Sequence, residues 1–266
     1  MIPTLKSEFK KILTIRSTYL WLLIALVIVG IYSFYGEGFK DSAGFLQHPA
    51  KAQLPLFIAG TITQMATFIG LFAGIIALLN ITHEYRYNTI TYTLTASNRR
   101  SKVLAAKILS IFGFTLVYSI LTALIGIGLI FAGLAFSHHV LPPQSLNYIT
   151  YVGKVAFFAE AYALVGLMLG VLIRNMAGSF AALFLIPGPI EALLSLLLRT
   201  DSVYLPFMAL SQVIQTPVIS NGGHPAHPDN NNLGSLTAPK GAAVFLVYLV
   251  IGWAVAWYLF SRRDAA

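Results

Sequence analysis

Six long stretches of the sequence consist almost entirely of apolar residues, and they restrict the possible folds more than any other feature. A helix needs about 20 consecutive apolar residues to cross the hydrocarbon core of a bilayer. Only 10% of the residues are charged, whereas an ordinary soluble domain has about 25%. We therefore expect an all-α polytopic membrane protein, with a single membrane domain over residues 1–266 and six transmembrane helices near residues 19–35, 54–81, 103–136, 149–173, 177–198 and 241–260.

Lysine and arginine residues are divided unequally between the two alternating sets of connections that join these stretches. Of the 17 basic residues, 12 fall in the set that includes both termini, 4 fall in the other set, and Lys154 falls within a stretch. Cytoplasmic loops of membrane proteins carry an excess of Lys and Arg. The asymmetry predicts a multi-pass protein of the cytoplasmic membrane with both termini in the cytoplasm. It also accounts for the net charge of +8 without nucleic-acid binding.

The residues before the first apolar stretch have the pattern of an amphipathic helix. Within residues 2–17 the basic side chains of Lys6 and Lys10 share one helical face, and a separate face is apolar, with Leu5, Phe9, Ile12 and Leu13. Helices of this kind lie in the interface between lipid and water. We expect an N-terminal interfacial helix on the cytoplasmic side.

The sequence contains no complete motif for catalysis, metal binding or nucleotide binding. It has no cysteine, which excludes disulfides and thiolate metal sites. His83-Glu84 begins like the zinc-protease motif H-E-x-x-H, but Tyr87 stands where the second histidine is required. No phosphate-binding loop of the form G-x-x-x-x-G-K-[ST] is present. We therefore expect no catalytic site, metal site or cofactor on this chain.

The connection between the second and third stretches, residues 83–107, is the most informative polar segment. Ile90 and Leu94 are spaced i, i+4, which predicts a short helix lying between the two spans. Such a helix offers a rigid surface to a cytoplasmic partner. The alternative is a solvated basic loop that only sets the topology of the chain.

The residues of this connection resemble a known family. The pattern Glu84-x-Arg86-x-x-Thr89-Ile90, followed by Leu94, Arg99-Arg100 and Val103-Leu-Ala-Ala-Lys107, is similar to the segment after the second span in ABC-2 type transporter permeases. Those proteins are the six-span membrane subunits of ATP-driven exporters. Two positions depart from the usual pattern, because Asn88 replaces a glycine and Ala96-Ser97 replaces a proline-containing turn. Asparagine tolerates a left-handed backbone better than most residues, so the first departure is compatible with the same shape.

The resemblance implies how the chain would work. The connection would be a coupling helix that seats in a cytoplasmic ABC ATPase subunit, and that partner would bind ATP and Mg²⁺. The implied assembly contains a second permease subunit, either identical or different, surrounded by membrane lipids. The residues implied to couple the chain to the ATPase are Glu84, Tyr85, Arg86, Asn88, Thr89, Ile90, Leu94, Arg99 and Arg100.

Three ionisable residues fall inside the expected spans. Glu160 is near the middle of the fourth span, where it is a candidate either for lining a polar pathway or for packing as a neutral acid. Glu191 follows Pro187-Gly-Pro189, a triplet that we expect to interrupt the hydrogen bonds of the fifth helix. Lys154 and Glu191 differ in depth by only about 6 Å. We therefore expect them to form an ion pair, the alternative being that Lys154 extends to the outer surface.

Two pairs of glycines are spaced four residues apart in the expected spans. They are Gly70 with Gly74 in the second span and Gly166 with Gly170 in the fourth. Small residues at this spacing allow two helices to approach closely. We expect these contacts within one chain, the alternative being a contact between two subunits.

Two other classes of function are compatible with six spans. One is an accessory membrane subunit that binds a partner and transports nothing. The other is a stand-alone channel or secondary carrier, but carriers usually have interrupted helices at equivalent positions of two halves. Here a single Pro-Gly-Pro triplet is present, so the permease subunit of an ABC exporter is the expected function.

Overall fold

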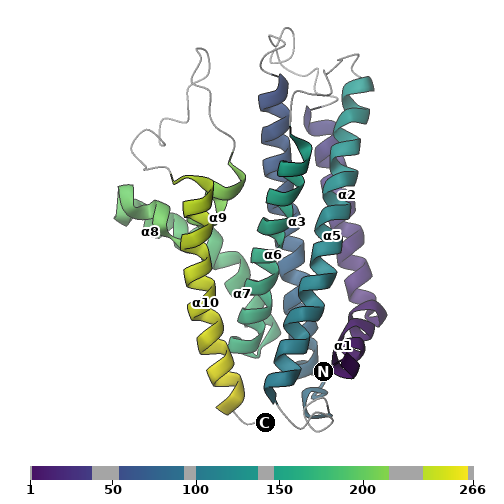
Figure 1. Cartoon of the computed structure of the whole chain (residues 1–266), viewed down its shortest axis with the longest axis vertical. Coiled ribbons are helices and arrows are strands. Elements are labelled where there is room, and N and C mark those ends of the chain that lie inside the picture. The colour runs from purple at the N-terminus through teal and green to yellow at the C-terminus, as the bar shows by residue number, and fades with distance from the viewer. Residues whose placement is uncertain (1, 38–53, 93–99, 137–146, 216–235, 263–266) are drawn as a thin grey trace.

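The computed structural model describes residues 2–37, 54–92, 100–136, 147–215 and 236–262 (Figure 1). These residues form helices joined by short turns, and no strand occurs among them. The elements are α1 (Ile2–Thr14), α2 (Arg16–Glu37), α3 (Leu54–Arg86), α5 (Arg100–Phe136), α6 (Tyr148–Ile173), α7 (Met176–Leu185), the π-helical turn η1 (Ile186–Ile190), α8 (Glu191–Leu198), the 3₁₀ turn η2 (Arg199–Tyr204), α9 (Pro206–Ile214) and α10 (Ala238–Arg262).

Six helical stretches of the described chain are long and apolar enough to cross a membrane. The predicted all-α polytopic fold is therefore confirmed. Four of the spanning helices extend beyond the predicted apolar stretches to charged residues: α2 begins at Arg16, α3 continues to Arg86, α5 begins at Arg100 and α10 continues to Arg262. Polar side chains can continue a helix past the hydrocarbon core, so apolarity alone underestimates the length of a spanning helix.

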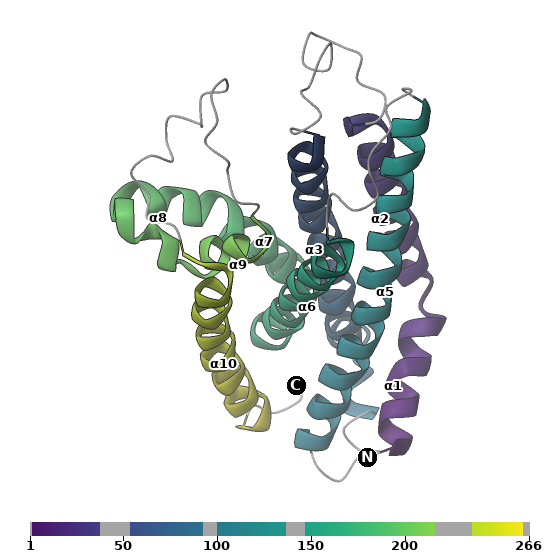
Figure 2. The same cartoon turned by 45° about the horizontal axis from the view of Figure 1, so that its top comes forward.

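Helices α3 and α6 form the centre of the bundle. Helices α2 and α5 pack on one side of this pair, and α7, α9 and α10 lie on the other side (Figure 2). Helix α1 and the C-terminal end of α10 lie at the same end of the molecule (Figure 1), which we call the terminal end. An even number of spans requires this arrangement.

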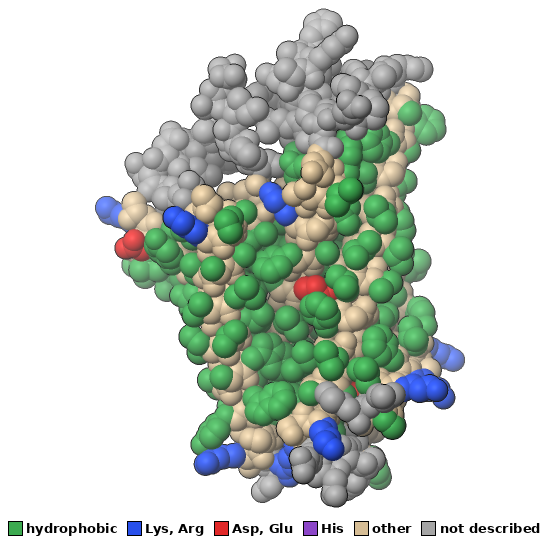
Figure 3. Space-filling model, in the orientation of Figure 1, with side chains coloured by type: hydrophobic (Ala, Val, Ile, Leu, Met, Phe, Trp, Pro, Cys, Tyr) green, Lys and Arg blue, Asp and Glu red, His purple; other side chains and the backbone are tan. Residues whose placement is uncertain are grey.

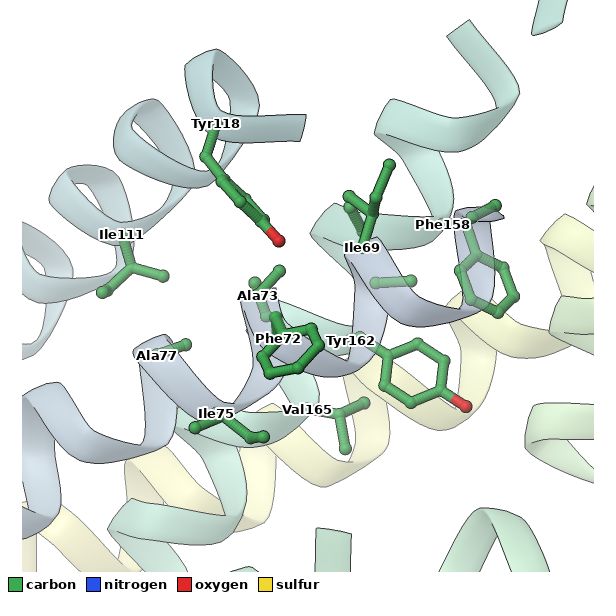
Figure 4. Close-up of a cluster of buried hydrophobic side chains, with 14 of the residues drawn as sticks. Ile69, Phe72, Ala73, Ile75, Ala77, Ile111, Tyr118, Phe158, Tyr162 and Val165 are labelled. Carbon is green, nitrogen blue, oxygen red and sulfur yellow. The ribbon is translucent and has the colours of Figure 1, made fainter. Parts of the chain in front are cut away.

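The predicted contact through glycines is confirmed within one chain. A β-carbon added to Gly166 of α6 would overlap the backbone of Gly74 in α3, and one added to Gly70 would lie 2.9 Å from the ring of Phe158. The two backbones approach so closely only because neither glycine has a side chain. Larger side chains of α6 fill the space beside the contact, namely Phe158 and Tyr162, which are drawn in Figure 4.

The regular α-helical hydrogen bonds of the fifth span are interrupted at Pro187-Gly-Pro189, as predicted, but the chain does not break there. The chain instead forms the π-helical turn η1, in which the backbone N–H of Glu191 donates to the carbonyl oxygens of Gly188 and Ile186. Prolines have no N–H group to donate. In the wider π-helical turn the N–H of Glu191 reaches the carbonyl oxygen of Ile186, five residues earlier in the chain. Beyond η1, α8 runs outward from the bundle at the level of the far end of α10 (Figure 1).

Candidate coupling site

Four charged side chains meet where α1, α3 and α5 converge at the terminal end. The Nζ of Lys107 lies 2.7 Å from Glu8 Oε2 and 2.7 Å from Glu84 Oε1. The Nζ of Lys11 lies 2.7 Å from Glu8 Oε1 and 2.8 Å from Glu84 Oε1. Two acids and two lysines therefore form a closed network, which we call the ion cluster.

Three of the four side chains of the ion cluster are buried, and the fourth, Lys11, is 34% exposed. The side chain of Lys107 is fully enclosed, and that of Glu8 is 1% exposed. Charged groups lose their hydration in such a place, and they remain charged only when hydrogen bonds and opposite charges replace the water. Short charge-assisted hydrogen bonds replace the water at both oxygens of Glu8 and at Oε1 of Glu84, and Glu84 Oε2 has no partner among the described residues. The cluster ties the ends of α3 and α5 to α1.

The two residues that α1 contributes have shifted pKa values. Burial by itself would raise the pKa of the Glu8 carboxyl, but the charges and hydrogen bonds of Lys107 and Lys11 outweigh burial and lower that pKa. Burial by itself would lower the pKa of Lys11, but hydrogen bonds to Glu8 and Glu84 outweigh it and raise that pKa. Both groups are therefore charged at neutral pH.

Helix α3 ends directly beside the ion cluster in a tight turn. The backbone N–H of Thr89 donates to the carbonyl of Glu84 at 3.0 Å, and that of Asn88 donates to the carbonyl of Tyr85 at 3.3 Å. Asn88 has a left-handed backbone with φ of 53°. This is a Schellman cap, in which glycine or asparagine usually takes the left-handed position. The expectation that Asn88 fits the position of a glycine is confirmed.

Residues 86–92 form an exposed segment at the end of α3. Arg86, Asn88 and Thr89 are exposed, and Tyr87 and Tyr92 are 65% and 76% exposed. Helical backbone resumes at residues 90–92, where Ile90 is buried against the core. We call residues 86–92 the elbow.

A groove of about 650 Å³ lies between the elbow and the end of α1. Apart from Ile15, it is lined by polar and aromatic side chains: Lys11, Thr14, Asn80, His83, Glu84, Tyr87, Thr89 and Tyr92. The ion cluster forms its inner wall through Lys11 and Glu84. The elbow is therefore an exposed surface with a rigid, charge-paired support beneath it.

The predicted coupling residues take different positions. Glu84 points inward to the lysines of the ion cluster, and Tyr85 lies half-buried with the Arg174 guanidinium 5.5 Å from its ring centre. Arg100 opens α5. Leu94 and Arg99 lie outside the described residues. That the nine predicted residues contact an ATPase stays a prediction.

The elbow also contacts the turn between α6 and α7. Arg174 ends α6 with a left-handed backbone, φ 56°, and Asn175 caps α7 by accepting a hydrogen bond from the N–H of Gly178 at 3.0 Å. The Nη1 of Arg86 lies 3.8 Å from Met176 Sδ. A second groove, of about 690 Å³, lies between this turn and the end of α3. On the face shown in Figure 3, lysine and arginine side chains lie at both ends of a hydrophobic band.

The predicted ion pair between Lys154 and Glu191 is wrong. Both oxygens of Glu191 accept backbone hydrogen bonds, from the N–H of Phe207 at 2.8 Å and the N–H of Met208 at 2.9 Å. These amides belong to the first turn of α9, where helix N–H groups lack partners within the helix. Lys154 instead places its Nζ 5.8 Å from the ring centre of Tyr151. A match in depth did not establish that the two side chains face each other.

Glu160 lies in the middle of α6, with 6% of its surface exposed. Its Oε1 accepts a hydrogen bond from Thr115 Oγ1 of α5 at 2.8 Å. Its Oε2 is buried and has no hydrogen-bond partner among the described residues.

Three members of the ion cluster are absent from the predicted site. In the sequence Lys11 counts only as a topology-setting charge, Lys107 closes the segment that resembles the family without being among the predicted coupling residues, and Glu8 is a lone acid in a basic segment. The position of Lys107 could have indicated the ion cluster, because the four residues before it, Val103–Ala106, are apolar and are predicted to lie within the spanning helix. A lysine one turn further in needs an acidic partner.

Asn88 gives a direct test of the cap. Asn88→Gly is expected to leave the thermal midpoint of the detergent-solubilised chain nearly unchanged, because glycine adopts a left-handed backbone freely. Asn88→Val is expected to cost about 1–2 kcal/mol, because a β-branched residue is strained there. Equal midpoints for the two variants would show that the cap does not stabilise the elbow.

The chain was compared with known proteins. A family model described as ABC-2 family transporter protein matches residues 3–265. A search of curated proteins found no match.

Proposed function

The chain belongs to the ABC-2 family of transporter proteins, and from that premise we propose that it is the permease subunit of an exporter driven by ATP hydrolysis on a separate ATPase subunit. Membership supports a permease component of an ABC transporter. The sequence contains no phosphate-binding loop. ATP and Mg²⁺ are therefore assigned to the partner, and the chain itself carries no catalytic step.

The elbow is the proposed docking surface for the ATPase. The observation that carries this assignment is the ion cluster directly behind it, because Glu84 and Lys107 join α3 and α5 to α1 through bonds of 2.7–2.8 Å. A force applied to exposed residues such as Tyr87 and Tyr92 is then transmitted to three helices together. A flexible loop at this place would absorb the movement instead.

The roles of the predicted coupling residues divide accordingly. Arg86, Asn88 and Thr89 are exposed and are proposed to contact the ATPase. Glu84 and Ile90 are buried and are proposed to support the elbow from within. In this proposal the chain lies in the cytoplasmic membrane, and its terminal end faces the cytoplasm. The basic side chains within residues 83–107 agree with this orientation, because cytoplasmic loops carry an excess of Lys and Arg.

The translocation pathway is proposed to lie between two permease subunits, identical or different, within the lipid bilayer. Helices α7 and α8 present many apolar side chains outward, including Leu193, Leu196 and Leu197. Such a surface suits lipid or a second subunit equally.

Co-purification tests the proposal. The tagged chain, extracted from its native membrane, is expected to retain a stoichiometric ABC ATPase. Tyr87→Ala combined with Tyr92→Ala is expected to reduce the retained ATPase at least about 10-fold, the loss expected when exposed interface aromatics are removed. The control is Tyr204→Ala, because Tyr204 is also an exposed tyrosine (51%) but lies in η2, away from the elbow.

Two outcomes would contradict the proposal. One is the absence of any ATPase with the intact chain, which would favour an accessory subunit. The other is substrate movement by the chain alone in vesicles without ATP, which would favour a stand-alone channel or carrier.

A further inference from the structure

A groove of about 590 Å³ opens between α5, α6 and α10. Its walls are aliphatic and aromatic, and they include Phe112, Phe157 and Phe245. Pockets that bind small molecules typically have volumes of about 300–1,000 Å³, apolar walls and a few polar groups. The groove therefore has the size and lining of a site for a small apolar molecule.

Glu160 is the single polar side chain among the described residues that line this groove. Thr115 Oγ1 donates to its Oε1 at 2.8 Å, which fixes the orientation of the carboxyl group. The other oxygen, Oε2, is buried and meets no hydrogen-bond partner within the described part of the chain. A buried polar atom without a partner is costly, and the cost disappears when a ligand supplies one.

Glu160 lies deep within the bundle, and Oε2 finds no partner in the described ranges of the chain. Glu160 is 12 residues from the start of α6 and 13 from its end, so it lies about 18 Å along the helix from either end. Lys154, the lysine of the same helix, directs its Nζ to Tyr151 instead. Figure 3 shows acidic atoms within the hydrophobic band of this face.

We propose that the groove binds a lipophilic amine, with the apolar body against α5, α6 and α10 and the nitrogen on the Glu160 carboxyl group, which has to turn so that the covered Oε2 meets it. An amine and a carboxylic acid share one exchangeable proton, so the bound pair is neutral whichever group holds the proton. An alcohol leaves an ionised Glu160 uncompensated, and a fatty acid brings a second carboxyl group. An amine therefore satisfies both the hydrogen bond and the charge when Glu160 is ionised, which an alcohol of the same shape does not.

The consequence for transport, that lipophilic amines are a substrate class, rests on the proposed permease function. Binding itself needs no ATPase, so the two can fail separately. Loss of the ATPase in the co-purification experiment would leave the binding site untouched.

Photolabelling of the purified chain in phosphatidylcholine nanodiscs tests the site. The probe is dodecylamine that carries a diazirine on its chain, and the matched probe has a hydroxyl group in place of the amine. We expect the amine probe to label peptides of α6 and α10 about 10-fold more than the alcohol probe, since a charge-assisted hydrogen bond is roughly worth that factor. Excess dodecylamine should compete away this labelling, and excess dodecanol should not.

Two variants locate the binding group. Glu160→Gln keeps an acceptor for Thr115 but not the charge, and it is expected to remove the preference for the amine. Gly153 lines the groove, and a β-carbon there would meet nothing within 4 Å. Gly153→Leu therefore places a side chain in the groove and is expected to reduce labelling by both probes.

The proposal is overturned by equal labelling with the two probes, by equal competition from dodecanol in the unchanged chain, or by a preference that persists in Glu160→Gln. The competition measurement uses the unchanged chain, so it decides the matter even where a variant fails to fold.

Discussion

Gly166→Ala is expected to prevent the chain from reaching its native fold. The added β-carbon would overlap the backbone oxygen and α-carbon of Gly74, and backbone atoms cannot move aside as a side chain can. Overpacking a core usually costs about 1–3 kcal/mol, and a contact between two backbones should reach or exceed the upper value. The yield of monodisperse protein in mild detergent and its thermal midpoint would measure the effect.

Gly153→Ala is the matched control, because Gly153 lies in the same helix with open space at its β position. It is expected to be neutral or to stabilise the chain by up to about 1 kcal/mol, since alanine favours a helix more than glycine does. Comparable yields for both alanine variants would show that α3 and α6 do not depend on the glycine contact.

Lys107→Met is expected to be the most damaging change at the ion cluster. It leaves the buried carboxylates of Glu8 and Glu84 with Lys11 as their remaining cation. Removing one partner of a buried ion pair costs about 3–5 kcal/mol. The expected result is a lower thermal midpoint together with release of α1, seen as faster proteolysis near residues 2–14.

Lys102→Met serves as the control, because Lys102 is an exposed lysine of the same helix, and it is expected to change little. The double variant Lys107→Met with Glu8→Gln restores the balance of charge between Lys11 and Glu84. We expect it to be less destabilised than the sum of the two single changes. Strict additivity would refute a coupled cluster.

The sequence predicts the spans well and the polar contacts poorly, for a physical reason. A spanning helix is a local property, since about 20 apolar residues specify it whatever surrounds them. The bond between Lys107 and Glu8 joins residues 99 apart in the chain, and nothing local marks the partner. The depth argument for Lys154 and Glu191 failed in the same way, because depth leaves the direction around the helix axis undetermined.

Local backbone chemistry was the exception among the polar features. The left-handed position of Asn88 could be anticipated because it depends on the conformational range of one residue. The buried position of Glu84 could not be anticipated, because the same motif is compatible with a carboxylate facing a partner or facing inward. The sequence therefore located the segment that contains the elbow, and the structure was needed to tell its exposed residues from the buried Glu84 beside it.

The π-helical turn η1 sets the rotational phase of the second half of the fifth span. In a regular helix, residues 183 and 191 point in directions that differ by about 80°. The wider turn takes in one extra residue, which changes the phase by about 100° and brings the two directions to within about 20° of each other. Leu183 and Glu191 are accordingly both buried. An insertion or deletion within residues 186–190 would swing the carboxylate off the amides of α9, 16 residues further along the chain. The length of this short turn is thus under stricter constraint than its composition.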